Sequence, residues 1–341
     1  TFYEHAVTLA RSRHIDGPYE TLPGNPLLTA WQKPTDGLQR SGHASLVETA
    51  KGEWFLAHLC GRPLEWSGTN ADQNDPTGGY AGLHCPLGRE TALQRIRWRD
   101  DDWPEVVGGP QPSLHITQPD LPPHPFPAEA ARDDFDSPTF NGHLNSLRKP
   151  FDESWASLTA RPGHLRLTGR ESLMSLFDQS LVARRQQHFN CRIETRVDFE
   201  PDNFHQMAGL VAYYNTRNHA YLHVTRDPDS DQRVVYLTVN RDGAISAPGA
   251  PVPLAAGPAD LAVEFSHDTY QFHFRQGGQA WQTIGPALDA AMLSDEFATR
   301  FINGFANNFG FTGNFIGIAC QDLAGTRKAA DFDYLSYEAR P

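Results

Sequence analysis

The fold class is decided by one stretch of the sequence, Arg192-Ile193-Glu194-Thr195-Arg196-Val197-Asp198-Phe199. Charged residues at the even positions alternate with Ile, Thr, Val and Phe at the odd positions. In a β-strand, successive side chains point to opposite faces of the sheet. We therefore predict a strand whose odd-numbered side chains face a core and whose charged side chains face water.

The same alternation recurs around this stretch, in Val234–Val239, Leu261–Phe265 and Tyr270–Phe274. Asp242-Gly243 and Gly277-Gly278 have the composition of hairpin turns between such strands. The only helical candidate is Ala287–Phe297. This half of the chain is therefore expected to be a β-sandwich of about 200 residues.

The first third of the chain contains shorter candidate strands. They are Tyr3–Ala10, Ala44–Val47, Trp54–Leu59 and Ala92–Trp98, and turn residues separate them. Short strands joined by tight turns suit either propeller blades or a sandwich. These residues alone do not decide between the two.

A proline-rich segment separates the two parts. Gly108–Pro127 contains seven prolines and no strand pattern. Proline-rich linkers are extended and semi-rigid. We place a domain boundary near residue 130, which gives two domains, as expected for 341 residues.

Composition excludes several classes of partner and structure. The 41 acidic residues exceed the 29 basic ones, and the net charge of -12 argues against a nucleic-acid partner. No stretch of 18 apolar residues predicts a membrane span. The widely spaced Cys60, Cys85, Cys191 and Cys320 are expected to be reduced, which fits a cytoplasmic protein.

Several short motifs, in this order, resemble those of β-xylosidases of glycoside hydrolase family 43. They are Tyr3-Glu4-His5-Ala6, Gly17-Pro18-Tyr19-Glu20, Gly42-His43-Ala44-Ser45, Gly52-Glu53-Trp54-Phe55-Leu56, Gly61-Arg62-Pro63-Leu64, Cys85-Pro86-Leu87-Gly88-Arg89-Glu90-Thr91, Ala160-Arg161-Pro162-Gly163-His164-Leu165, Gly169-Arg170-Glu171-Ser172-Leu173, Phe311-Thr312-Gly313 and Asp331-Phe332-Asp333-Tyr334.

The resemblance implies an all-β fold, a partial five-bladed β-propeller followed by a concanavalin A-like β-sandwich. Residues 1–107 would form the C-terminal blades of the catalytic propeller, 108–130 the linker and 131–341 the sandwich. The N-terminal half of the propeller is then needed to complete the pocket, and the intact enzyme is expected to be a homo-oligomer.

The resemblance also implies an exo-acting, inverting β-xylosidase that releases xylose from xylo-oligosaccharides, with an α-L-arabinofuranosidase side activity. No cofactor is expected for catalysis. The base Asp, the Asp that tunes the acid's pKa and the acid Glu of the family would lie upstream of Thr1. We therefore expect no catalytic residue in this sequence and no activity from it alone.

Four residues resemble members of the family's substrate pocket. Thr1 corresponds to a threonine lining the xylose site, and His43 to a histidine near the propeller axis. Arg89 corresponds to an arginine that reaches the sugar hydroxyls and the catalytic carboxylates. A permanent cation there would favour the ionised form of the base. Phe311 corresponds to an aromatic residue that the sandwich inserts over the site.

Asp134 and Asp333 flank the first and last expected strands of the sandwich. If these strands are neighbours, the two carboxylates could share a structural Ca²⁺, which takes six to eight oxygen ligands.

Two alternatives to the enzyme remain. The sandwich could act as a non-catalytic, lectin-like carbohydrate-binding module, or it could serve oligomer contacts. Exposed tryptophans in a row would favour the lectin, but only Trp155 and Trp281 lie beyond residue 130.

Overall fold

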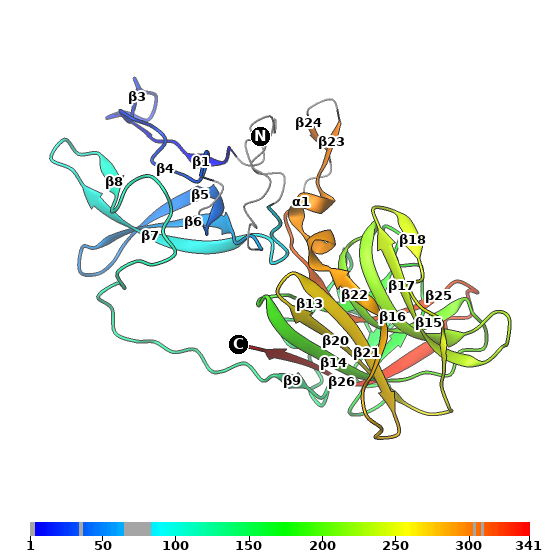
Figure 1. The fold of residues 1–341 in the computed structure, drawn as a ribbon. Coiled ribbons are helices and arrows are strands. Elements are labelled where there is room, and N and C mark those ends of the chain that lie inside the picture. The colour runs from blue at the N-terminus through cyan, green and yellow to red at the C-terminus, as the bar shows by residue number, and fades with distance from the viewer. Residues whose placement is uncertain (1–3, 34–36, 65–82, 303–304, 308–309) are drawn as a thin grey trace. The chain divides into compact units, whose positions relative to one another are not determined.

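The computed structural model describes residues 4–33, 37–64, 83–302, 305–307 and 310–341. The chain divides into two compact units. Unit 1 contains Thr1–Pro127 and the later segment Thr299–Thr312, and unit 2 contains Ala128–Ala298 and Gly313–Pro341. Almost all of the regular structure in the described residues is β-strand (Figure 1), so the all-β prediction is confirmed.

Unit 1 is built around an antiparallel sheet of four strands, a number typical of one propeller blade. Its strands, in spatial order, are β5 (Gln39–Glu48), β6 (Trp54–Gly61), β7 (Glu90–Trp98) and β8 (Pro104–Val106). Three two-stranded sheets complete the unit: β1 (Ala6–Val7) with β4 (Leu28–Thr29), β2 (Ala10–Arg11) with β3 (Glu20–Thr21), and β23 (Arg300–Ile302) with β24 (Phe305–Asn307).

Unit 2 is a sandwich of two antiparallel sheets, each of eight strands. The first sheet has the order β10 (Asn145–Ser146), β13 (Ser180–Arg185), β25 (Phe315–Asp322), β15 (Gln206–Asn215), β16 (Asn218–Arg226), β17 (Arg233–Arg241) and β18 (Ala244–Ser246), with β19 (Val252–Pro253) also pairing with β17. The second has the order β11 (Ala156–Ser157), β12 (Leu165–Thr168), β26 (Ala329–Ala339), β14 (Asn190–Asp198), β20 (Ala259–Ser266), β21 (Thr269–Gln276) and β22 (Gln282–Asp289), with β9 (Arg132–Asp133) also pairing with β26.

The strand predicted at Arg192–Phe199 is β14, in the middle of the second sheet. Ile193, Thr195 and Val197 are each 0% exposed, as their odd positions predict. Arg192 departs from the prediction because it is buried, with its guanidinium hydrogen-bonded to Glu194 and Glu264. A neighbouring strand supplies Glu264, so the sequence of β14 alone could not predict this burial.

The two predicted hairpin turns are present. Asp242 and Gly243 both have positive φ, 52° and 85°, between β17 and β18. Gly277 and Gly278 lie in the connection between β21 and β22, with φ of 62° and 76°. Positive φ at both central residues is the requirement of the tight turn that matches strand twist.

Helix is confined to a short region of unit 2 among the described residues. The expected helix over Ala287–Phe297 is wrong in its first part, because β22 continues to Asp289 by pairing with β21. A 3₁₀ turn, η1 (Ala290–Leu293), and the single turn α1 (Asp295–Ala298) follow. The expected strand over Tyr3–Ala10 is likewise replaced, within its described part, by β1 and β2.

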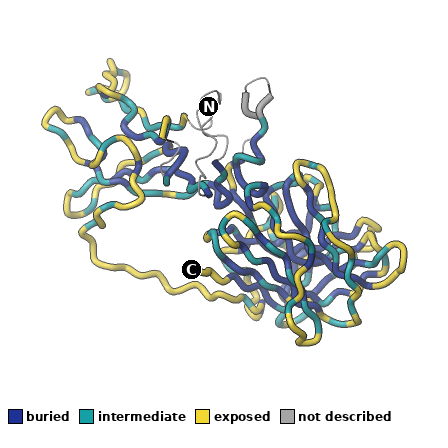
Figure 2. Tube along the Cα trace, viewed as in Figure 1, coloured by how far each residue is buried: buried dark blue, intermediate teal, exposed yellow. Residues whose placement is uncertain are grey.

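The proline-rich segment has no regular structure, and residues 121–130 are exposed throughout, as the yellow tube in Figure 2 shows. Unit 2 encloses a continuous buried interior, coloured dark blue in the same view. The four cysteines form no disulfide with one another, and all four are buried.

Candidate functional site

The start of β5 is irregular in a way that re-aims its side chains. Arg40 and His43 have positive φ, 55° and 49°, although neither is glycine. The pairing of β5 with β6 shifts register twice, between Gln39 and Gly42 and between Gly42 and Ser45. Left-handed backbone at such residues costs about 1–3 kcal/mol each and clusters at functional sites. The irregular start of β5 is therefore the candidate site of unit 1.

His5 packs against this irregular backbone. Its Nδ1 lies 3.1 Å from the carbonyl oxygen of Arg40, within hydrogen-bonding distance. A Cβ atom on Gly42 would lie only 2.5 Å from Cδ2 of His5. Glycine at position 42 is therefore what allows the imidazole to reach this position.

Arg40 brings a permanent cation into the interior of unit 1. Its side chain is 2% exposed, and a Cβ on Gly61 would lie 2.4 Å from one of its terminal nitrogens. The neighbouring Arg62 forms two hydrogen bonds of 2.9 and 2.8 Å to the carboxylate of Glu90. Glu90 is thus already engaged by an arginine.

The pKa of His5 is lowered from its ordinary value. Burial is the main cause, and the charges of Arg89, His43 and Arg40 lower it further, whereas the hydrogen bond to the Arg40 carbonyl opposes them. His5 therefore stays neutral to lower pH than a free histidine, and a neutral imidazole has one nitrogen to donate and one to accept.

Arg89 and Phe311 are in direct contact. The guanidinium carbon of Arg89 lies 4.2 Å from the centre of the Phe311 ring, which is the geometry of a cation–π interaction. Arg89 immediately precedes β7 and is half-buried, while Phe311 is 42% exposed. Both residues belong to unit 1, because Phe311 lies in the segment Thr299–Thr312.

Two family models match the chain. Residues 1–104 match "Glycosyl hydrolases family 43", and residues 132–338 match "Beta xylosidase C-terminal Concanavalin A-like domain". The chain belongs to glycoside hydrolase family 43.

Known members of the family are similar over nearly the whole chain. A β-xylosidase of Bacillus subtilis (strain 168) is 42% identical, over 100% of this chain and 62% of the relative. A xylosidase/arabinosidase 43B of Humicola insolens is 39% identical, over 99% of this chain and 60% of the relative. The crystal structure of a xylan β-1,4-xylosidase from Bacillus halodurans C-125 is 46% identical with a TM-score of 0.88, over 98% of this chain and 61% of that one.

This chain therefore spans about three fifths of the length of these family 43 relatives. Their similarity confirms the fold predicted for it, part of a five-bladed propeller followed by a concanavalin A-like sandwich.

The structure places the predicted pocket residues as follows. Arg89 and Phe311 are brought together, and His43 is exposed on β5, where its charge and that of Arg89 both act on His5. Thr1 lies outside the described residues. His5 and Arg40 were not predicted as site residues, although His5 lies within one of the family motifs. The glycines that admit them, Gly42 and Gly61, were the available signal.

Asp134 and Asp333 lie near neighbouring strands, since β9 pairs with β26. Their carboxylates are nevertheless engaged by arginines, Asp134 by Arg132 at 2.5 Å and Asp333 by Arg196 at 3.5 Å. Among the described residues, no group of three or more His, Cys, Asp and Glu side chains is placed to hold a metal ion. The two carboxylates are paired with arginines, and a calcium ion between them stays a prediction.

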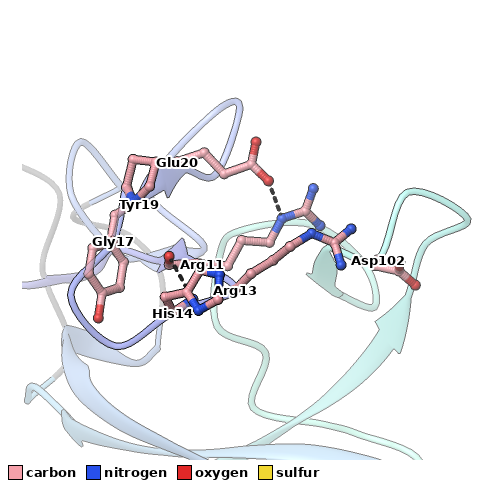
Figure 3. A pocket seen from close by; sticks show the side chains of 9 residues that line it. Arg11, Arg13, His14, Gly17, Tyr19, Glu20 and Asp102 are labelled. Carbon is pink, nitrogen blue, oxygen red and sulfur yellow. Dashed lines mark hydrogen bonds and ion pairs between the residues drawn. The ribbon is translucent and has the colours of Figure 1, made fainter.

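A surface cavity of about 560 Å³ lies elsewhere in unit 1, around the turn between β2 and β3 (Figure 3). Its charged lining residues balance, with Arg11 and Arg13 against Glu20 and Asp102, and Arg11 is already paired with Glu20 at 2.5 Å. None of the predicted pocket residues lines it. In the described part of the chain, no helix has the length and apolar character needed to cross a membrane.

Proposed function

We propose that this chain is part of an inverting, exo-acting β-xylosidase that releases xylose from xylo-oligosaccharides. Its role would be to supply His5, His43, Arg89 and Phe311 to the substrate pocket, together with Thr1. The contact of Arg89 with Phe311 carries this proposal. It joins a fixed cation to an aromatic face, and both are features that sugar pockets of glycosidases use.

Arg89 would stabilise the charge of a nearby carboxylate, and Phe311 would exclude water from the pocket. A guanidinium is charged at all relevant pH values, so it lowers the pKa of a carboxylate beside it and keeps a general base ionised. The aromatic ring covers an apolar sugar face and excludes water from the groups around it. Neutral His5 donates its single N–H, on Nδ1, to the carbonyl oxygen of Arg40, which leaves Nε2 to accept a hydrogen bond from an uncharged hydroxyl group.

The acid and the base are proposed to come from residues outside the 341 of this chain. Inversion needs two carboxyl groups roughly 6.5–9.5 Å apart, one protonated and one ionised. Glu90, the carboxylate next to Arg89 in sequence, is held by both hydrogen bonds to Arg62 and is poorly placed for either role. The N-terminal half of the propeller is the proposed source.

An α-L-arabinofuranosidase side activity is part of the proposal, and a relative named xylosidase/arabinosidase supports it. The lectin-like alternative is disfavoured. Trp155 is 1% exposed, and the ring of Trp281 is covered by Arg192 at 4.7 Å and Arg275 at 4.5 Å. Neither tryptophan of unit 2 is classed as exposed, so the row of exposed tryptophans that a lectin would favour is not formed.

A homo-oligomeric state and a cytoplasmic location also belong to the proposal. The four free, buried cysteines favour a reducing compartment. A structural calcium ion at Asp134 and Asp333 would require Arg132 and Arg196 to release these carboxylates.

The test is complementation. The chain alone is expected not to hydrolyse an aryl β-xyloside, whereas its mixture with the N-terminal propeller half, the complemented enzyme, should do so. Arg89→Ala should abolish the activity of the mixture, while Arg97→Ala, on an exposed side chain of β7, should preserve it. Turnover by the chain alone, or none by a mixture of two folded halves, would contradict the proposal.

A further inference from the structure

The sandwich of unit 2 is interrupted by a segment that belongs to unit 1. The chain leaves unit 2 after Ala298, at the end of α1, and re-enters it at Gly313, just before β25. The intervening Thr299–Thr312 carries Phe311, only two residues before the re-entry point. Contacts that hold the two ends of this segment therefore also restrict the position of the Phe311 ring.

A buried carboxylate holds the re-entry point. Asp295, the first residue of α1, is 0% exposed. Its Oδ1 accepts a hydrogen bond of 3.0 Å from the backbone N–H of Gly313 and one of 2.5 Å from the hydroxyl of Tyr214. Tyr214 lies on β15 and is itself 7% exposed. One oxygen thus joins the helical turn, the sheet and the end of the segment.

A second hydrogen bond closes the segment on itself. The backbone N–H of Gly310, next to Phe311, donates to Oγ1 of Thr299 at 2.9 Å. Thr299 follows α1 directly, and both partners are buried. The residues on either side of Phe311 and Thr312 are therefore tied down, Gly310 to Thr299 and Gly313 to Asp295.

The chemistry of Asp295 indicates a specific role. A carboxylate without solvent contact is costly to bury unless donors surround it, and an apolar residue of similar size would usually serve packing as well. Two donors to Asp295 are a tyrosine of the sheet and the amide at which the Phe311-bearing segment ends.

We infer that Asp295, with Tyr214, is a positioning residue for Phe311, because it fixes the backbone at the end of the segment that carries this ring. The effect expected on enzyme activity rests on the proposed function. The contact of Phe311 with Arg89 can be followed without any reaction. Asp295 is assigned no part in binding substrate or in the reaction. It acts through Gly313 on the adjoining aromatic residue.

The experiment follows the Nε–Hε resonance of Arg89 by NMR in the chain itself, because a ring 4.2 Å away shifts that signal. Asp295→Ala should move it to the position found in Phe311→Ala and should speed hydrogen exchange of the Gly313 amide by about tenfold, the effect of one lost hydrogen bond. Asp295→Asn keeps an accepting oxygen, so the Arg89 resonance and the exchange rate of the Gly313 amide should both stay close to those of the wild type.

Asp322→Ala is the matched control. Asp322 is a comparably buried carboxylate, 5% exposed, that accepts hydrogen bonds from Thr326 and from the amide of Lys328. Its loss should lower stability without moving the Arg89 signal. If Asp295→Ala does not fold, Tyr214→Phe removes one donor while keeping the ring, and a partial shift in the same direction is expected. An unchanged Arg89 signal in the folded Asp295→Ala or Tyr214→Phe variant would overturn the inference.

The complemented enzyme gives the second readout. Asp295→Ala and Phe311→Ala should each raise KM more than they lower kcat, and Asp295→Ala should have no further effect when Phe311 is already Ala. Additive effects of the two substitutions would contradict a role through Phe311. If the complemented enzyme has no activity at all, the proposed function fails, while the Arg89 resonance still decides the role of Asp295.

Discussion

The imidazole of His5 lies against Gly42 so closely that a methyl group on Gly42 would come within 2.5 Å of Cδ2 of His5 and 2.6 Å of Nε2. At the same irregular start of β5, Arg40 supplies the carbonyl that His5 contacts. The charges of Arg89 and His43 both lower the pKa of His5. The position of His5 therefore depends on the absence of a side chain at residue 42.

Gly42→Ala should displace His5. Overpacking of this kind costs about 1–3 kcal/mol of stability, and the activity of the complemented enzyme should fall with it. Gly142→Ala is the control, because a Cβ there meets nothing within 4 Å. Urea melts and kcat/KM measured on both variants check the prediction. Equal activity of Gly42→Ala and the wild type would show that the position of His5 does not affect catalysis.

Arg89→Lys should weaken the complemented enzyme although the charge is kept. Lysine lacks the planar guanidinium that lies over the Phe311 ring, and such contacts are worth about 0.5–2 kcal/mol. We expect kcat/KM to fall by roughly 2–30-fold. Arg97→Lys, at an exposed arginine paired with Glu105, is the control and should change nothing. A wild-type kcat/KM for Arg89→Lys would mean that only the charge matters.

Unit 2 should lose stability as the pH falls from about 6.5 toward 4. Burial lowers the pKa of His219 and of His223 from 6.5 to about 4, against hydrogen bonds to the Asn215 and Tyr221 carbonyls that raise it. In that range the unfolded chain binds more protons than the folded one, so the free energy of unfolding decreases by up to roughly 3 kcal/mol per histidine.

Urea unfolding at pH 7.5, 6 and 5 measures this slope. His223→Leu should flatten it, because Nε2 of His223 is buried without a hydrogen-bond partner and contributes only its charging cost at low pH. Thr225→Val on the same strand is the control and should keep the wild-type slope. Parallel slopes for His223→Leu and the wild type would refute the assignment.

Chelation should leave the thermal midpoint of the chain unchanged if Asp134 and Asp333 are satisfied by arginines. Arg132 and Arg196 neutralise them in the structure, so no bound ion is needed for charge balance. Thermal melts with EDTA and with added calcium test this. A calcium-dependent rise in Tm that disappears in Asp333→Asn would instead establish the calcium site that the sequence predicts.

The elements predicted well from the sequence are those whose pattern is local. β14, β17, β20 and β21 each alternate with a period of two, and the turns at Asp242-Gly243 and Gly277-Gly278 need residues that tolerate positive φ. The helix expected near Ala287 failed because Leu288 and Asp289 pair with Tyr270 and Thr269 of β21. Distant pairing overrode local preference there.

The site was predicted unevenly for the same reason. Arg89 and Phe311 could be selected from motifs, and the structure places them in contact. His5 and Arg40 were not selected, because Gly42 and Gly61 mark only that space is left beside them, and the sequence does not show which side chain fills that space. Positive φ at Arg40 and His43 has no sequence signature, since neither residue type requires it.

The segment Thr299–Thr312 belongs to unit 1 although the sequence on both sides of it belongs to unit 2. The two units therefore cannot be separated by one cut in the sequence. A gene fusion made at the proline-rich segment would move Phe311 together with unit 2, although Phe311 belongs to unit 1 and contacts Arg89 there. Recombination at the proline-rich segment therefore exchanges residues of unit 1 together with the whole of unit 2. Under the proposed function, selection on the contact of Arg89 with Phe311 acts on sequence before and after this segment, and the two parts are expected to diverge in step.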